Sequence, residues 1–413
     1  MGLITRDSTF SSLYRQNFDQ RLSITAQLEP VREFRVDINF DKTFSKEYTE
    51  LFKDTLSLNN TNYKQHLSPY ASGGFSVSYI GINTLFQKSN PNQISAVFQK
   101  FEDNRIIISK RVAEQNPYWQ SSTNKFTADG FARGYGRYSQ DVLIPAFLAA
   151  YTNKSPNSVS LIKQSNANIK SNPFSGIIPK PNWRLSYTGL SKIPALAKIF
   201  SAINITHAYS GTLSMNSYTS ALLYSDPFKL GAPGFVDTIS GNYIPFYLVP
   251  NISMQEQFSP LIGIDVTTTK QLNLKFEYKK SRQVSLSLID YQMSETDSKE
   301  WVFGFNWRKR GLKLPFRLPG ILGKKLQNDL NIKVDLSMRD DATSNSRIDQ
   351  TNAYGTGGQK IITIQPSIDY VLNNRINLKL FFTQRKITPY VSSSPPTINT
   401  TAGLQIRYSL SPK

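Results

Sequence analysis

Alternation of apolar and polar residues is the feature that most constrains the fold of this chain. Between residues 331 and 338 the even positions are apolar and the odd positions are polar. Side chains of a β-strand alternate between two faces, so this pattern gives a strand with one apolar and one polar face. The same alternation recurs at 272–278, 376–382 and 402–410. The sequence therefore predicts an all-β fold built as an antiparallel meander.

The predicted strands are numerous and long. The chain holds about 14 of them, judged from alternation and turn signals. The stretches 271–279, 329–338 and 361–370 run for nine to ten residues. Soluble strands average about 5–6 residues, whereas bilayer-crossing strands need about 9–11. We therefore predict an antiparallel transmembrane β-barrel wall of about 14 strands, part of a larger barrel. A large soluble β-rich protein is the alternative.

Three regions follow from the pattern along the chain. Residues 1–87 are predicted to hold the first strands and a long polar loop at 41–74. Residues 88–180 interrupt the alternation and form a mixed helical and loop insertion, with helix-compatible spacing at 93–115 and an apolar stretch at 140–151. That apolar stretch is too short to span a bilayer as a helix. Residues 181–413 are predicted to form the meander that ends in the closing strand.

The predicted connections between the late strands differ in length. Tight turns are expected at Lys279–Arg282 and at Asn373–Asn374, and longer loops at 340–358 and 386–399. Short turns on one side and long loops on the other are typical of outer-membrane barrels. This asymmetry favours the membrane interpretation over a soluble sandwich.

Large aromatic residues lie near the ends of the predicted strands. Such residues form girdles at the two membrane–water interfaces of barrels. The candidates for this interfacial position are Trp183, Tyr278, Trp301, Trp307 and Tyr370.

The final predicted strand carries a second signal. Thr401, Gly403, Ile406 and Tyr408 follow the order polar, glycine, apolar, aromatic. This order is similar to the closing-strand signal that outer-membrane assembly machinery recognises. We predict that these four residues mark the closing strand of a barrel.

Composition removes several classes of function. The chain has no cysteine, which excludes thiol catalysis and disulfides, and its two histidines, His66 and His207, are far apart. The acidic pairs Asp340–Asp341 and Glu47–Glu50 have no accompanying base or metal ligand, so solvated carboxylates are expected. No catalytic residue, cofactor site or metal site is therefore predicted.

The net charge of +19 is the other unusual quantity. No nucleic-acid-binding module accompanies it, so nucleic acid is not a predicted partner. A polar, net-basic lumen that offers no apolar surface to a passenger is the preferred explanation. No apolar run forms a secretory signal near the first residues, which favours a piece of a longer exported precursor.

Three stretches resemble one known family. Residues 140–151 (QDVLIPAFLAAY), 181–190 (PNWRLSYTGL) and 251–263 (NISMQEQFSPLIG) are similar to the C-terminal portion of the SprA/Sov translocon, the giant outer-membrane barrel of the type IX secretion system. The resemblance implies a wide lumen through which cargo proteins cross the outer membrane. It also implies several partners: membrane lipid, the remaining N-terminal part of the same barrel, a PorV-like barrel, a periplasmic plug protein and the secreted cargo.

Two other functions stay open. A self-contained outer-membrane porin or transporter barrel would have its own signal peptide and a strand set that closes on itself. A soluble β-rich adhesin or carbohydrate-binding module would remain in the aqueous phase on detergent extraction. The resemblance carries no catalytic residues, and the insertion at 88–180 is expected to contribute to a gate or to a lateral opening.

Overall fold

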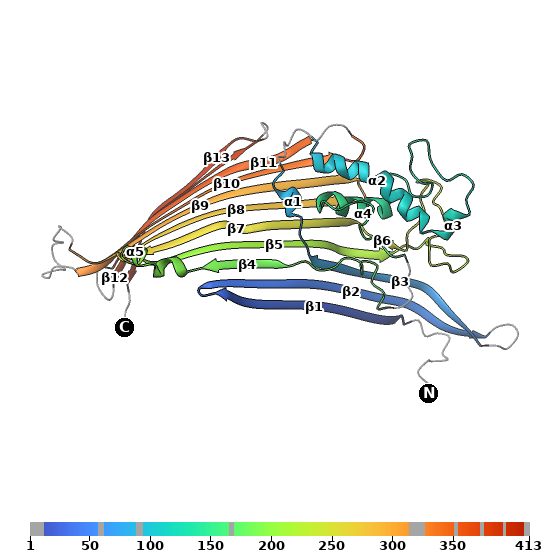
Figure 1. Ribbon diagram of the computed structural model, residues 1–413, viewed down its shortest axis with the longest axis horizontal. Coiled ribbons are helices and arrows are strands. Elements are labelled where there is room, and N and C mark those ends of the chain that lie inside the picture. Colours follow the sequence, from blue (N-terminus) through green and yellow to red (C-terminus); the bar gives the residue numbers. More distant parts are fainter. Residues whose placement is uncertain are drawn as a thin grey trace.

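The computed structural model is one large antiparallel sheet with helices over half of one face (Figure 1). It describes residues 12–56, 62–87, 94–164, 169–313, 327–350, 354–371, 376–390 and 394–408. The sheet has 13 strands, and every printed strand pair is antiparallel. The prediction of an all-β antiparallel wall with a helical insertion is therefore confirmed. The strands are β1 (Tyr14–Val31), β2 (Phe34–Leu56), β3 (Asn62–Ser78), β4 (Asn182–Tyr187), β5 (Phe200–Ser220), β6 (Tyr247–Leu248), β7 (Asn251–Thr268), β8 (Leu272–Ser287), β9 (Gln292–Lys313), β10 (Gln327–Arg347), β11 (Tyr354–Val371), β12 (Ile376–Pro389) and β13 (Thr397–Tyr408).

The strands follow one another across the sheet almost in chain order. The path runs β1-β2-β3-β5-β7 and then continues in sequence to β13, while β4 lies between β2 and β5 and β6 pairs with β5. Each long strand therefore pairs with its neighbours in the chain, as in a meander. Within the described residues, β1 and β13 each have one neighbour only, so both edges of the sheet are open.

One strand of the wall is split into two collinear pieces. β3 and β4 both lie between β2 and β5, β3 over one half of their length and β4 over the other. On β2, Lys42 faces the last part of β3 and Asn39 faces Asn182 of β4. The gap between the two pieces is thus about one residue wide. The chain leaves the sheet at this gap after Ser78 and returns at Asn182, and residues 79–181, here called the insertion, lie between the two crossings.

The insertion contains the longer helices of the structure. Ser95 caps α2 by accepting a hydrogen bond from the Phe98 amide, and Asn116 caps the next short helix in the same way. Residues 141–151 of α4 are all buried, which explains why this helix is apolar around its whole circumference. The helices predicted at 93–115 and 140–151 correspond to α2 and α4. The helical elements are α1 (Ile82–Leu85), α2 (Ala96–Glu114), α3 (Pro117–Gln120), α4 (Gln140–Tyr151), the 3₁₀ turn η1 (Gly189–Lys192) and α5 (Pro194–Ala197).

Several predicted loops and turns are strands instead. The polar stretch at 41–74 forms most of β2 and part of β3, which pair from Lys42 onward. The turn expected at Lys279–Arg282 lies inside β8, whose register with β9 is unbroken from Leu272 to Ser287. Backbone pairing on both sides outweighs the weak strand preference of these polar residues. The turn expected at 373–374 lies outside the described residues.

The expected long loops are also shorter than predicted. β10 continues to Arg347, and β12 and β13 take up most of 386–399. Within the described residues, no helix combines the length and apolar character needed to cross a bilayer.

Candidate functional site

The apolar and polar side chains of the late strands separate onto opposite faces of the sheet. Because β8 and β9 pair without a register shift, all even-numbered side chains of β8 point to one face. Val284 and Leu286 on that face are buried in the core that includes α4. Leu274 and Phe276 point the same way, further along the strand. The helices and the exposed apolar side chains therefore share one face, here called the helix-bearing face, and the other is called the polar face.

An apolar belt covers the part of the helix-bearing face that the helices leave bare. Its members are aligned by strand register, so that Phe276 faces Phe303, Phe303 faces Leu336 and Leu336 faces Ile364. Many are exposed, and Ile406 reaches 65%. A continuous exposed apolar surface of this kind marks a surface that water does not normally contact. The belt over β8–β13 comprises Leu272, Leu274, Phe276, Tyr278, Trp301, Phe303, Phe305, Trp307, Ile332, Val334, Leu336, Met338, Ile362, Ile364, Pro366, Ile368, Tyr370, Leu378, Leu380, Phe382, Leu404, Ile406 and Tyr408.

The height of the belt matches the apolar layer of an outer membrane. Eight residue steps separate Ile362 from Tyr370 on β11, which is about 26 Å along a strand at ~3.3 Å per residue. A tilt near 40° reduces this to about 20 Å, close to the ~25 Å apolar band of membrane barrels. The belt is therefore long enough to span most of the hydrocarbon layer.

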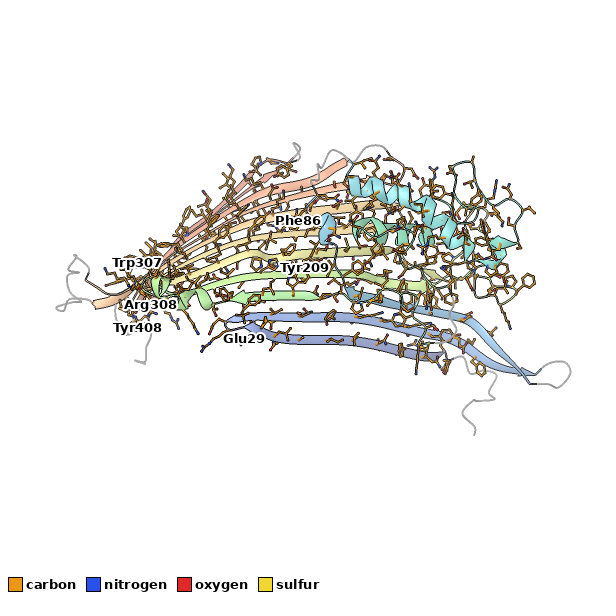
Figure 2. The ribbon with its side chains drawn as sticks, viewed as in Figure 1. Glu29, Phe86, Tyr209, Trp307, Arg308 and Tyr408 are labelled. Atoms are coloured by element: carbon orange, nitrogen blue, oxygen red, sulfur yellow. The ribbon has the colours of Figure 1, made fainter. Side chains whose placement is uncertain are left out.

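The predicted interfacial aromatics lie at the two ends of the belt. Tyr278 stacks on Trp301 with ring centroids 4.3 Å apart, at the end nearest the helices. Trp183 on β4 stacks on Tyr209 at 4.7 Å, beside the place where the insertion leaves the sheet. Trp307 lies near the far end, where Figure 2 also places Tyr408. Tyr370 ends the belt on β11 on the same side. The structure thus divides the predicted set into two groups separated by the belt.

The four residues of the predicted closing-strand signal all lie on β13, the edge strand. Ile406 and Tyr408 belong to the belt. Thr401 and Gly403 point to the polar face, because Gly403 is directly opposite Phe381 and a Cβ at Gly403 would lie 2.7 Å from that ring. The Phe381 ring therefore covers a glycine next to the open edge, an arrangement that shields weak edge positions in β-proteins.

The polar face carries charged residues of both signs. On β8, Glu277 forms ion pairs with Lys275 at 2.9 Å and with Lys279 at 3.3 Å. On β10, Lys333 pairs with Asp335 at 2.6 Å and Arg339 with Asp341 at 2.8 Å. Acidic neighbours thus neutralise many of the basic side chains on this face. Its late strands are polar as predicted, but its charge is mixed.

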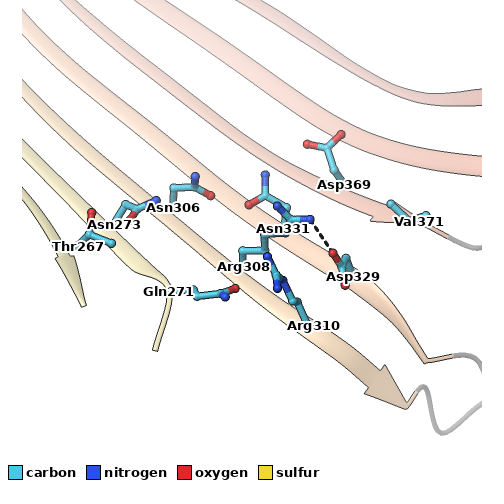
Figure 3. A pocket seen from close by; sticks show the side chains of 10 residues that line it. All are labelled: Thr267, Gln271, Asn273, Asn306, Arg308, Arg310, Asp329, Asn331, Asp369 and Val371. Atoms are coloured by element: carbon cyan, nitrogen blue, oxygen red, sulfur yellow. Dashed lines mark hydrogen bonds and ion pairs between the residues drawn. The ribbon is translucent and has the colours of Figure 1, made fainter. Parts of the chain in front are cut away.

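A polar groove lies on this face at the end away from the helices (Figure 3). It has a volume of about 440 Å³. Arg308 on β9 reaches Asp329 on β10 at 2.6 Å across it. The other residues that line it are Thr267, Gln271, Asn273, Asn306, Arg310, Asn331, Asp369 and Val371. The groove is open and rich in amides and charges, as expected of a wall in contact with water.

A buried ionic cluster fastens the insertion to the sheet next to the belt. Arg282 is 2% exposed and its Nη2 lies 2.6 Å from Glu256 Oε2. The same nitrogen donates a hydrogen bond to Thr84 Oγ1 of α1 at 2.7 Å. The other oxygen of Glu256 accepts hydrogen bonds from the Gly81 amide and from the Tyr209 hydroxyl. Sequence reasoning missed this cluster, because its members are up to 201 positions apart and each looks like an ordinary polar strand or loop residue.

The structure gives no support for a catalytic or metal centre among the described residues. No group of three or more His, Cys, Asp or Glu there is arranged to hold a metal ion. His207 contacts the Leu261 carbonyl through Nδ1 at 2.7 Å, and the side chain of His66 lies outside the described residues. Asp340 accepts a hydrogen bond from Tyr390, and Glu50 accepts one from Tyr48.

Comparisons with known proteins add little to this description. No protein-family model matches the sequence, and no curated protein matches it either. Among solved structures, the chain is similar to OmpT, an outer membrane protein of Vibrio cholerae in an in-vitro folded trimer form. The identity is 8%, the match covers 96% of this chain and 99% of that one, and the TM-score is 0.20. This score is too low to bear on fold or function, so the argument below rests on the two faces of the sheet.

Proposed function

We propose that this sheet is a wall of an outer-membrane β-barrel that acts as a channel or transporter. The helix-bearing face contacts lipid through the apolar belt, and the polar face lines the lumen. The observation that carries this proposal is the unbroken alternation of β8 and β9. It puts Phe276 and Phe303 on one face and Lys275, Glu277 and Glu300 on the other.

Within this class, we propose a wall segment of a protein-translocating barrel like that of the type IX secretion system. The resemblance of residues 140–151, 181–190 and 251–263 supports this assignment. The open edges at β1 and β13 support a wall that further strands extend, because an unpaired edge is not tolerated in lipid. The polar face offers cargo few apolar contacts, so passage would be passive, with remaining strands, a PorV-like barrel and a plug protein as partners.

Depth-dependent fluorescence quenching tests the membrane assignment. The chain has four tryptophans, and Trp119 is buried in the insertion while Trp301 lies in the belt. Protein reconstituted into bilayers with chain-brominated lipids should show strong quenching of a variant that keeps only Trp301. A variant that keeps only Trp119 should be unaffected. Equal quenching of the two, or none, would contradict a lipid-facing belt.

Paired cysteines test whether the wall belongs to a larger barrel. The chain has no native cysteine, so introduced ones are unique. If the chain closed on itself, some pair between β1 and β13, such as Thr25→Cys with Thr401→Cys or its neighbours along the strand, would form a disulfide in the membrane. A larger barrel predicts no such pair at any register. A cross-link would instead support the self-contained porin or transporter.

A further inference from the structure

A row of lysines lies just beyond the belt, on the side of the helices. Tyr278, Trp301, Met338 and Ile362 form the last apolar positions of β8–β11 there. The next outward-pointing residues are Lys280, Lys299, Asp340 and Lys360, which face one another in strand register. On β12, Lys386 is directly opposite Ile362 and so lies diagonally next to Lys360. The helix-bearing face therefore changes from apolar to basic within one step of the strand alternation.

Three of these lysines are exposed and lack an acidic partner. Lys299, Lys360 and Lys386 are exposed, and none of them forms an ion pair within the part of the chain that the structure describes. Lys280 differs, because it is 6% exposed and its Nζ lies 5.5 Å above the Phe86 ring. We call Lys299, Lys360 and Lys386 the lysine row.

The single carboxylate within the row is already engaged. Asp340 lies between Lys299 and Lys360, but its Oδ1 accepts a hydrogen bond from the Tyr390 hydroxyl at 2.5 Å. On the polar face of the same strands, Lys275, Lys279 and Lys333 all have acidic partners. The protein thus neutralises its lysines where they face the lumen and leaves them unneutralised where they border the belt.

We propose that the lysine row binds the phosphate groups of anionic lipids at the membrane surface. This inference rests on the proposed membrane assignment. Since Trp301 and Ile362 would lie at the edge of the hydrocarbon layer, ammonium groups two residues further along would stand at headgroup height, and flexible lysines reach toward that level. A lipid phosphate supplies the anion that the protein does not provide.

The insertion limits which part of the wall can take part. Phe86, at the end of α1, is 51% exposed and packs against Phe258, with ring centroids 5.7 Å apart. In Figure 2 it lies level with Tyr209, where the helical half of the sheet begins. The insertion and its buried Arg282 cluster therefore occupy the face over the middle strands. The lysine row, on β9, β11 and β12, stands to one side of it.

The test compares lipid binding by two matched triple variants. The protein purified in detergent from its own membranes is mixed with micelles that contain either phosphatidylglycerol or phosphatidylcholine. Bound lipid is counted by native mass spectrometry. Lys299→Gln, Lys360→Gln and Lys386→Gln together should weaken phosphatidylglycerol binding by about fivefold per lysine and leave phosphatidylcholine binding unchanged. The control Lys275→Gln, Lys333→Gln and Lys379→Gln changes the polar face of strands β8, β10 and β12 and should bind like the unmodified protein.

Three further arms decide the outcome. Arginine at the three row positions should preserve phosphatidylglycerol binding, since the charge is kept. Equal loss in both glutamine variants, or no loss in the row variant, overturns the lysine row as a lipid site. Displacement of phosphatidylglycerol by an equal concentration of inorganic phosphate would also overturn it in favour of a free-phosphate site. Detergent-phase partitioning separates the two proposals, because a protein that stays in water contradicts the membrane wall itself.

Discussion

The amide of Lys180 donates a hydrogen bond to the carbonyl of Ser78 at 2.8 Å, although 102 positions separate these residues. The Ser78 hydroxyl returns a bond to the Lys180 carbonyl at 2.6 Å. The place where the chain leaves the wall is therefore tied to the place where it returns. Tyr79 and Asn182 then bond to the two backbone groups of Gly211 on β5. We call this junction the seam.

Gly211 should be indispensable to the seam. A Cβ at this position would lie 2.2 Å from the Tyr79 carbonyl oxygen. Gly211→Ala therefore has to push the departing chain away from β5, and overpacking of this kind costs about 1–3 kcal/mol. Thermal unfolding followed by circular dichroism measures the loss. Gly357→Ala is the control, because nothing lies within 4 Å of a Cβ built there; equal effects would contradict the crowding argument.

Arg282 should hold the insertion against the sheet. Arg282→Ala leaves Glu256 buried without its cation, and breaking a buried pair in this way costs about 3–5 kcal/mol. Faster proteolysis within 79–181, while the strands stay protected, is the expected result. The double variant Glu256→Gln with Arg282→Met removes both charges and should recover much of the protection. If the double variant is cleaved as fast as Arg282→Ala, the pair is not what secures the insertion.

Neighbouring residues of β10 should respond oppositely to the same substitution. Leu336 points into the belt and Ser337 points to the polar face. Leu336→Arg places a charge at mid-membrane height and should cost about 2–4 kcal/mol, whereas a lumen-facing arginine is tolerated. The folded fraction in lipid vesicles across a urea titration measures both. Similar losses for Leu336→Arg and Ser337→Arg would argue for a sheet with water on both faces.

Asp141 should make the stability of the insertion depend on pH. Burial in α4 raises the pKa of this carboxyl to about 7, against a hydrogen bond from Gln164 that lowers it. Between about pH 4 and pH 7 the folded state keeps a proton that the unfolded state has lost. The stability contribution is therefore complete below about pH 4 and decreases as the pH rises to about 7. The unfolding midpoint should fall from pH 5 to pH 8 and fall less in Asp141→Asn; parallel curves would exclude Asp141 as the cause.

Strict alternation made the belt predictable from sequence. Ile332, Val334, Leu336 and Met338 were assigned to one face from their spacing alone, and strand pairing keeps them there. The apolar run at 140–151 likewise coincides with α4. In both places the local pattern and the final environment agree, because one face or one whole helix is buried or apolar.

Polar stretches were predicted less well, because their partners lie far away in the chain. Lys279–Arg282 resembles a turn, yet Arg282 is held in β8 by Glu256 and Thr84. The stretch 41–74 lacks a clear apolar face, and its strands are set by pairing with β1 and β5. The insertion was expected in a lumen, at a rim or at a gate. The structure places it on the same face as the belt, since Val284 packs in its core and Phe276 points the same way.

The one-residue gap between β3 and β4 makes the insertion an exchangeable part. Phe40 on β2 and Gly211 on β5 lie opposite the gap, and pairing resumes in the same register on either side. The circumference of the wall is consequently independent of what is spliced in at this point. A domain of different size could replace 79–181, provided that its two ends emerge side by side. Evolution or protein engineering can thus alter the outer surface of the pore without redrawing its strand order.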